Sequence, residues 1–199
     1  MRSTRSMLAA AAVCFLGTAT LTAGAEQANA SSLVAAAIAG DEARLRNLVA
    51  ELRVQPKPLR IDRPRARQLN EHGLALWQRQ RYAEAASVFR EAHAVDATDA
   101  EIAENLGYAL LKAGDVGAAE PAILAALELG PERASAWGSL GLIYAKQGKH
   151  HEGVACVLTA YRFSLQPKRA LDAYSRLALA DKDPKVRALL SEVMSRIGR

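Results

Sequence analysis

The chain of 199 residues carries 26 lysines and arginines against 21 aspartates and glutamates, a formal net charge of +5 at pH 7. With 50% hydrophobic and 24% charged residues it has the composition of an ordinary soluble protein with one core, and the lack of a long apolar stretch after the N-terminus excludes a multi-span membrane protein. Much of the hydrophobic fraction is alanine, the best helix former, so the composition favours helices.

Residues 1–30 have the order of a secretory signal peptide. Two arginines precede an apolar run, and small residues follow at two candidate cleavage sites, after Ala25 and after Ala30. The run has roughly 15 residues, fewer than the ~20 that span a bilayer, so we expect cleavage and no stable membrane span afterwards, with an uncleaved anchor as the alternative. The expected location is periplasmic or secreted. After cleavage Cys156 is the single cysteine, so no internal disulfide can form.

Residues 31–53 predict two short helices that break at Gly40, with Asp41 capping the second helix. The pair resembles the helix pair of an ankyrin repeat in one partial copy. We expect its apolar side to pack against the repeats that follow; an arm that binds a partner is the alternative. Residues 54–65 are predicted to be a linker. The basic run around them, residues 53–67, contains three prolines and no aromatic residue, which favours a solvated linker over a nucleic-acid surface.

A period of 34 residues organises the middle of the chain in three copies, residues 66–99, 100–133 and 134–167. The recurring positions are Gly73, Gly107 and Gly141; Ala85, Ala119 and Gly153; Phe89, Ile123 and Val157; and Ala92, Ala126 and Ala160. Small residues in the first two sets are expected where the two helices of a copy cross. Larger apolar residues at spacings of three and four fill the stripe of an amphipathic helix.

This pattern resembles the tetratricopeptide repeat (TPR), in which W-x2-L-G-x2-Y is followed by A-x3-F, Ala and Pro. The third copy matches best at its start, with Trp137, Leu140, Gly141 and Tyr144. Departures from the pattern occur at His72, Ala97 and Gly153. The resemblance covers about residues 66–167 and implies an all-α helix-turn-helix repeat array, a solenoid of about three repeats with flanking helices.

Residues 168–199 follow the third copy. We expect a helix from Arg169 to Ala180, and Asp183 with Pro184 provides a cap and a first-turn proline for a last helix. A repeat array needs an end helix over the exposed face of its last repeat, so these are predicted to be C-terminal capping helices.

The TPR resemblance implies a concave groove, formed by the first helix of each repeat, that binds extended or helical peptides. The groove candidates, by position in this sequence, are Asn70, Leu74, Trp77, Asn105, Tyr108, Leu111, Lys112, Ser135, Ser139, Leu142 and Lys146. In the family an asparagine at the position of Asn105 commonly hydrogen-bonds the ligand main chain; a solvated polar residue is the alternative. Trp77 is either an exposed interface anchor or packed against the N-terminal helix pair. Of the family's carboxylate-clamp positions only Asn105 fits, so a free acidic C-terminus is not the expected ligand.

The stretch from Trp137 to Gly153 holds a serine between glycines and two adjacent histidines. Ser139 lies in a predicted helix without the spacing of a nucleophile elbow, and adjacent helical residues point about 100 degrees apart, unlike a metal pair. We therefore expect no enzyme, cofactor, metal or nucleic-acid partner. The predicted function is a non-catalytic periplasmic scaffold or adaptor that binds a peptide segment of a cell-envelope protein; the alternative is a small hydrolase or accessory enzyme using carboxylates or histidines of the groove.

Overall fold

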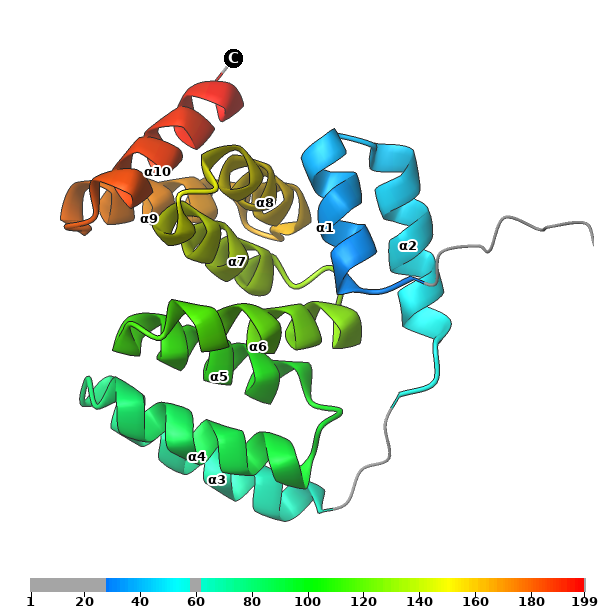
Figure 1. Ribbon diagram of the computed structural model, residues 1–199, viewed down its shortest axis with the longest axis vertical. Helices are drawn as coiled ribbons and strands as arrows, with labels where there is room; N and C mark the ends of the chain where they lie inside the picture. Colours follow the sequence, from blue (N-terminus) through cyan, green and yellow to red (C-terminus); the bar gives the residue numbers. More distant parts are fainter. Residues whose placement is uncertain (1–27, 58–61, 199) are drawn as a thin grey trace, which may run out of the picture.

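The computed structural model describes residues 28–57 and 62–198. Ten helices and no strands lie in these ranges, so the all-α prediction is confirmed (Figure 1). In chain order they are α1 (Ala30–Ala39), α2 (Glu42–Val54), α3 (Arg63–Gln78), α4 (Tyr82–Val95), α5 (Ala100–Ala113), α6 (Val116–Leu129), α7 (Ala134–Gln147), α8 (His150–Phe163), α9 (Pro167–Ala180) and α10 (Pro184–Ile197). The predicted signal peptide falls almost wholly on residues 1–27, outside the described residues. Within the described ranges, no helix has both the length and the apolar character needed to cross a bilayer.

Helices α3 to α8 form three antiparallel pairs, α3 with α4, α5 with α6 and α7 with α8 (Figure 1). In each pair the recurring glycine of the first helix lies against a large apolar side chain of the second. A Cβ atom at Gly73, Gly107 or Gly141 would lie 2.5, 2.6 or 2.4 Å from Phe89, Ile123 or Val157, respectively. Contacts this short would force the helices apart, so the 34-residue pattern marks the helix crossings. The predicted repeat array is confirmed.

The turns inside the second and third repeats follow their sequence signals. Gly114 and Gly148 have φ values of 91° and 82°, which residues with a Cβ rarely adopt. Their N–H groups bond to carbonyls of the preceding helix, which closes α5 and α7. The side chain of Asp115 then accepts the N–H of Ala118 and caps α6. Both turns lie where the sequence predicts them.

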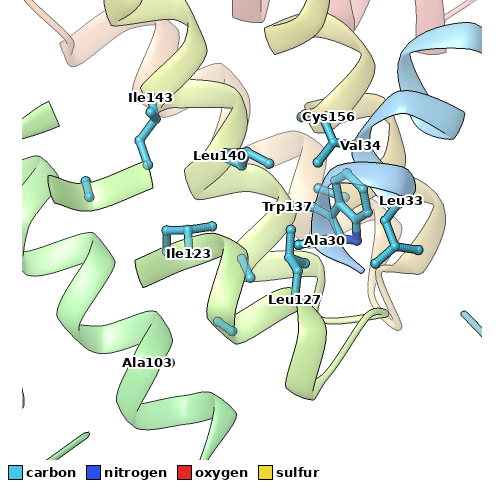
Figure 2. Close-up of a cluster of buried hydrophobic side chains, with 14 of the residues drawn as sticks. Ala30, Leu33, Val34, Ala103, Ile123, Leu127, Trp137, Leu140, Ile143 and Cys156 are labelled. Carbon is cyan, nitrogen blue, oxygen red and sulfur yellow. The ribbon is translucent and has the colours of Figure 1, made fainter. Parts of the chain in front are cut away.

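The N-terminal pair packs on α6 and α8, the second helices of repeats two and three (Figure 1). Figure 2 shows Trp137 of α7 surrounded by Ala30, Leu33 and Val34 of α1. Trp137 and Leu33 are both 0% exposed, and the indole N–H of Trp137 donates to the carbonyl of Pro131 over 2.8 Å. The expected packing of this pair against the repeats is confirmed. The sequence did not predict that it bypasses the first repeat.

Residues just before and inside α1 are part of the folded unit. The side chain of Asn29 caps α1, and the N–H of Ala30 donates to Glu128 of α6 over 3.2 Å. The side-chain amide of Gln55, just after α2, donates to the carbonyl of Ala28 over 2.9 Å. Ala28 and Ala30 are only 4% and 1% exposed. A mature chain that begins after Ala30 would lack all of these contacts.

At the C-terminus α10 covers the last repeat. It buries Val186, Leu189, Leu190 and Val193 in an apolar cluster with residues of α7 and α8, and α9 packs against the same cluster. His150 at the start of α8 pairs with Glu192 of α10 over 2.7 Å, so one of the two adjacent histidines joins the cap to the repeat. Helix α9 has no fully buried residue and packs chiefly on α10. The last repeat is therefore covered mainly by α10, while α9 lies beside α10 and also lines a cavity with α5 and α7.

Candidate functional site

A cavity of about 410 Å³ lies between α5, α7 and α9, on the side of the array formed by the first helices. Its lining residues from these three helices include Asn105, Tyr108, Ser135, Ser139, Leu142, Ala173, Tyr174 and Leu177. Most of the wall is apolar, and the polar groups gather on α5 and at the start of α7. Tyr174 and Leu177 of α9 are partly buried: they pack against the apolar cluster of α7, α8 and α10 and also line this cavity.

A second cavity, of about 310 Å³, adjoins the first and shares Tyr108, Leu142 and Leu177 with it. We call the two together the groove. The second cavity is basic, with the side chains Lys112, Lys146 and Lys182 beside Asp181. Lys112 lies 5.6 Å from the centre of the Tyr82 ring, a cation–π contact, and Lys146 lies 3.4 Å from Asp183. One end of the groove is therefore apolar and the other positively charged.

Asn105 on the groove wall forms a hydrogen-bonded pair with Asn70. Its side-chain amide donates to the side-chain oxygen of Asn70 on α3 over 2.9 Å, and both residues are half-buried. An amide group has an oxygen that accepts and two N–H groups that donate, so the pair keeps one free acceptor and further donors. This is the complement of a peptide main chain, which offers one N–H and one C=O per residue.

Trp77 at the end of α3 belongs to an aromatic cluster. Its ring centre lies 5.9 Å from those of Tyr82 and Tyr108, and its buried indole N–H has no hydrogen-bond partner among the described residues. Both sequence interpretations of Trp77 are thus replaced. It is neither an exposed anchor nor packed on the N-terminal pair, but supports the groove residue Tyr108 from behind.

The predicted groove residues of α5 and α7 line one cavity or both: Asn105, Tyr108, Leu111, Lys112, Ser135, Ser139, Leu142 and Lys146. The predicted α3 residues Asn70, Leu74 and Trp77 are not among the lining residues; Asn70 and Trp77 contact the groove through Asn105 and Tyr108. Leu111 and Ser139 are only 4% and 7% exposed, so they belong to the wall rather than the open surface. Sequence reasoning missed Tyr174 and Leu177, although their three-residue spacing on α9 was a signal that could have found them.

Two tyrosines of the groove remain protonated hydrogen-bond donors at neutral pH. Burial raises the pKa of Tyr174 to about 12 and also raises the pKa of Tyr108, so both phenols are protonated at neutral pH. Glu104 at the cavity edge is held by Arg133 over 2.7 Å. In the described part of the chain, no cluster of three or more His, Cys, Asp or Glu side chains is placed to hold a metal ion. The arrangement is suited to holding a ligand segment.

The family comparison agrees with this geometry. The tetratricopeptide repeat family model matches residues 70–134 and 104–164, which together run from α3 to Ser164, directly after α8. The chain is a tetratricopeptide repeat protein. The TPR resemblance is thereby confirmed, while export of the chain stays a prediction. No curated protein sequence matches the chain.

Solved structures show the same fold at low sequence identity. The type III secretion chaperone SycD of Yersinia enterocolitica, in complex with a peptide of the translocator YopD, has a TM-score of 0.56 and 14% identity over 69% of this chain and 98% of that chain. A crystal structure of MamA protein has a TM-score of 0.50 and 21% identity over 84% of this chain and 85% of that chain. At these identities the likeness concerns the fold alone.

Proposed function

We propose that this TPR protein is a non-catalytic scaffold or adaptor that binds a peptide segment of another protein in its groove. The observation that carries the proposal is the apolar cavity of about 410 Å³ with the Asn70–Asn105 amide pair at its edge. Apolar walls with a few placed polar groups are typical of binding sites, in which the polar groups orient the ligand. The SycD structure, solved with a YopD peptide, supports the proposal because it shows that this fold can hold one.

The groove also suggests the chemistry of the bound segment. An apolar side chain would enter between Leu142, Tyr174 and Leu177. The main chain of the bound segment would form hydrogen bonds with the Asn70–Asn105 amide pair. Acidic side chains of the segment would lie at the other end of the groove, near Lys112 and Lys146. Charge complementarity of this kind mainly sets the direction in which a segment lies and how fast it associates.

The proposal extends to location: the chain is exported, its signal peptide is cleaved after Ala25, and its partner is a protein of the cell envelope. The order of charged, apolar and small residues at the N-terminus supports export. Cleavage after Ala25 is supported because it keeps Asn29 as the cap of α1 and Ala28 in its buried position. Fractionation of cells and the intact mass of the mature protein would test both points.

To test the binding function, we would immobilise protein beginning at Glu26, pass solubilised envelope proteins over it and identify what is retained. Leu142→Arg places a charge in the apolar cavity and is expected to abolish retention of the partner. Leu179→Arg is the matched control, because Leu179 on α9 is 88% exposed and lies outside both cavities. Overlapping peptides of the captured protein, titrated against the wild type, would then locate the bound segment.

The outcome is decisive only for folded variants, so both are first compared with the wild type by circular dichroism and thermal unfolding. A partner retained by the wild type and by Leu179→Arg, but lost with Leu142→Arg, supports the groove. Retention of the same proteins by all three contradicts it.

A further inference from the structure

A separate cavity of about 350 Å³ lies between α2 and α8, where the N-terminal pair meets the third repeat. Leu45 and Val49 of α2 form its apolar floor together with Phe163 at the end of α8. Leu45 and Val49 are each only 6% exposed, and Phe163 is half-buried. We call it the α2/α8 cavity. It exists only because the N-terminal pair packs on the array, so the repeats alone do not form it.

The rim of this cavity is positively charged. The α2/α8 cavity and an open hollow of about 1000 Å³ beside it are bordered by Arg46, Arg53, Arg162 and Arg169, against the carboxylates Glu42 and Glu132. Arg162 and Arg46 lie 3.0 and 3.9 Å from Glu42, and Arg53 pairs with Glu132. Four positive charges thus face two negative ones, and a ligand that supplies carboxylates would balance the rim.

The hollow connects the α2/α8 cavity to the groove. It shares Arg53, Arg162 and Phe163 with the α2/α8 cavity, and Ser135 and Ser164 with the groove. Leu165, which lines the hollow, is 98% exposed, an unusual position for a large apolar side chain beside arginines. A chain segment leaving the groove past Ser135 would therefore cross the hollow and reach the α2/α8 cavity.

We propose that the α2/α8 cavity is a second docking site, which takes an apolar side chain from an acidic segment of a protein partner. This proposal rests on the proposed function, because it assumes that the groove holds an adjacent segment of the same partner. A lipid surface fits less well, because the apolar floor is concave and Glu42 and Glu132 stand among the arginines. The N-terminal pair then extends the binding surface beyond the repeats.

Ala50 offers a matched pair of variants. It lines the cavity and is exposed on α2, so either a glutamate or a lysine can replace it without disturbing the core. The probe is a short fluorescein-labelled peptide with a Leu-Phe core flanked by aspartates and glutamates, and its counterpart carries the same core flanked by lysines. Anisotropy titrations at low salt, where exposed charges act most strongly, measure both peptides. Amide NMR shifts map where they bind.

We expect the acidic peptide to bind the wild type, with shifts at Val49, Ala50 and Phe163. Its affinity should fall at least about fivefold with Ala50→Glu and hold or rise with Ala50→Lys. Equal binding of acidic and basic peptides, equal effects of the two variants, or shifts confined to the groove would overturn the proposal. So would sedimentation with phosphatidylglycerol vesicles in the absence of any peptide binding.

The Leu142→Arg variant separates this inference from the proposed function. It should abolish partner capture by the groove and any binding of the probe there, since the basic end of the groove also suits acidic side chains, while the shifts at Val49, Ala50 and Phe163 persist. If capture depends on Leu142 but the Ala50 variants have no effect on the probe, the second site fails and the groove stands. If the Ala50 variants behave as expected but capture ignores Leu142, the groove proposal fails and the partner must be sought at the α2/α8 cavity.

Discussion

At Gly141 the backbones of α7 and α8 come unusually close. A Cβ atom there would lie 2.4 Å from a methyl group of Val157 and 3.0 Å from the carbonyl oxygen of Gly153. Because one of these atoms belongs to the backbone, the contact cannot be relieved by a change of side-chain rotamer alone. At Gly107 a Cβ atom would likewise lie 3.1 Å from the backbone nitrogen of Ile123, whereas at Gly73 the nearest atoms all belong to the ring of Phe89. The backbone argument therefore applies to the second and third repeats.

We therefore predict that Gly141→Ala lowers the free energy of unfolding by about 1–3 kcal/mol, the usual cost of overpacking. Gly138 lies on the same helix, and a Cβ atom there would be 4.0 Å from Ala160. Gly138→Ala should be neutral or raise the free energy by up to about 1 kcal/mol through helix propensity. Urea unfolding followed by circular dichroism measures both, and equal effects of the two substitutions would contradict the crossing argument.

Cys156 predicts an alkaline loss of stability. Its side chain is 0% exposed, and burial raises the pKa of the thiol above its usual range. The unfolded thiol ionises near pH ~8.5 while the folded one stays protonated, so the stabilisation is complete below that pH and is lost as pH rises. We expect the free energy of unfolding to fall by about 1.4 kcal/mol per pH unit above that point, measured with a reductant present. Cys156→Ala removes this slope, and an unchanged slope in the variant would disprove its origin.

The sequence does not predict those contacts between side chains that depend on how each helix is rotated about its axis. The crossing glycines are predictable because small residues recur with a fixed period. The Asn70–Asn105 bond joins two helices across 35 positions, and the Trp77 cluster needs two tyrosines from different helices. Periodicity marks which side of a helix is buried, but it does not say which side chains meet there.

At the scale of helices, the start of α1 decides where the mature protein can begin. A chain that starts at Ser31 loses the Asn29 cap and the contacts of Ala28 and Ala30. We predict that it unfolds at a lower temperature than a chain that starts at Glu26. Asn29→Ala in the chain that starts at Glu26 should lower the free energy of unfolding by about 1 kcal/mol, which measures the contribution of the cap. Identical melting of the Ser31 and Glu26 proteins would remove the structural argument for cleavage after Ala25.

Helix α9 is expected to be the least protected helix of the C-terminal region. It has no buried residue, whereas α10 buries four on the last repeat. Local opening should therefore cost little free energy, and amide hydrogens of α9 should exchange with solvent much faster than those of α10. Hydrogen-exchange mass spectrometry measures both, and a bound groove peptide should slow exchange in α9 specifically. Equal protection of the two helices would contradict this view of α9 as a weakly held wall of the groove.

The flanking helices show how far element-level prediction reaches. Gly40 does end α1 with φ 67°, and Asp41 does cap α2, because caps are set by local residues. Which surface receives the pair is a tertiary question, since an apolar stripe fits any complementary surface of the array. The same limit explains α9: its amphipathic pattern predicts an apolar side but not the concave side as its neighbour.

Across the whole molecule, the three repeats are covered unequally. The third repeat contacts α1 on one side and α10 on another, in addition to the second repeat. The first repeat packs mainly on α5 through α4 and has no flanking helix packed on its outer side among the described residues. In a repeat array the stability of each repeat depends on the helices packed against it. Unequal packing should therefore make the third repeat more stable than the first.

We therefore predict that α3 and α4 open before α7 and α8. Hydrogen exchange at increasing, sub-denaturing urea should give a lower opening free energy for the first repeat than for the third. Deleting residues 28–57 removes α1 from α8, so it should lower protection of the third repeat more than that of the first. One shared opening free energy for all three repeats, unchanged in rank by the deletion, would mean that the array unfolds as one cooperative unit. In that case the groove, which is built chiefly from α5, α7 and α9, would be stabilised by the whole array and not mainly by the helices that flank the third repeat.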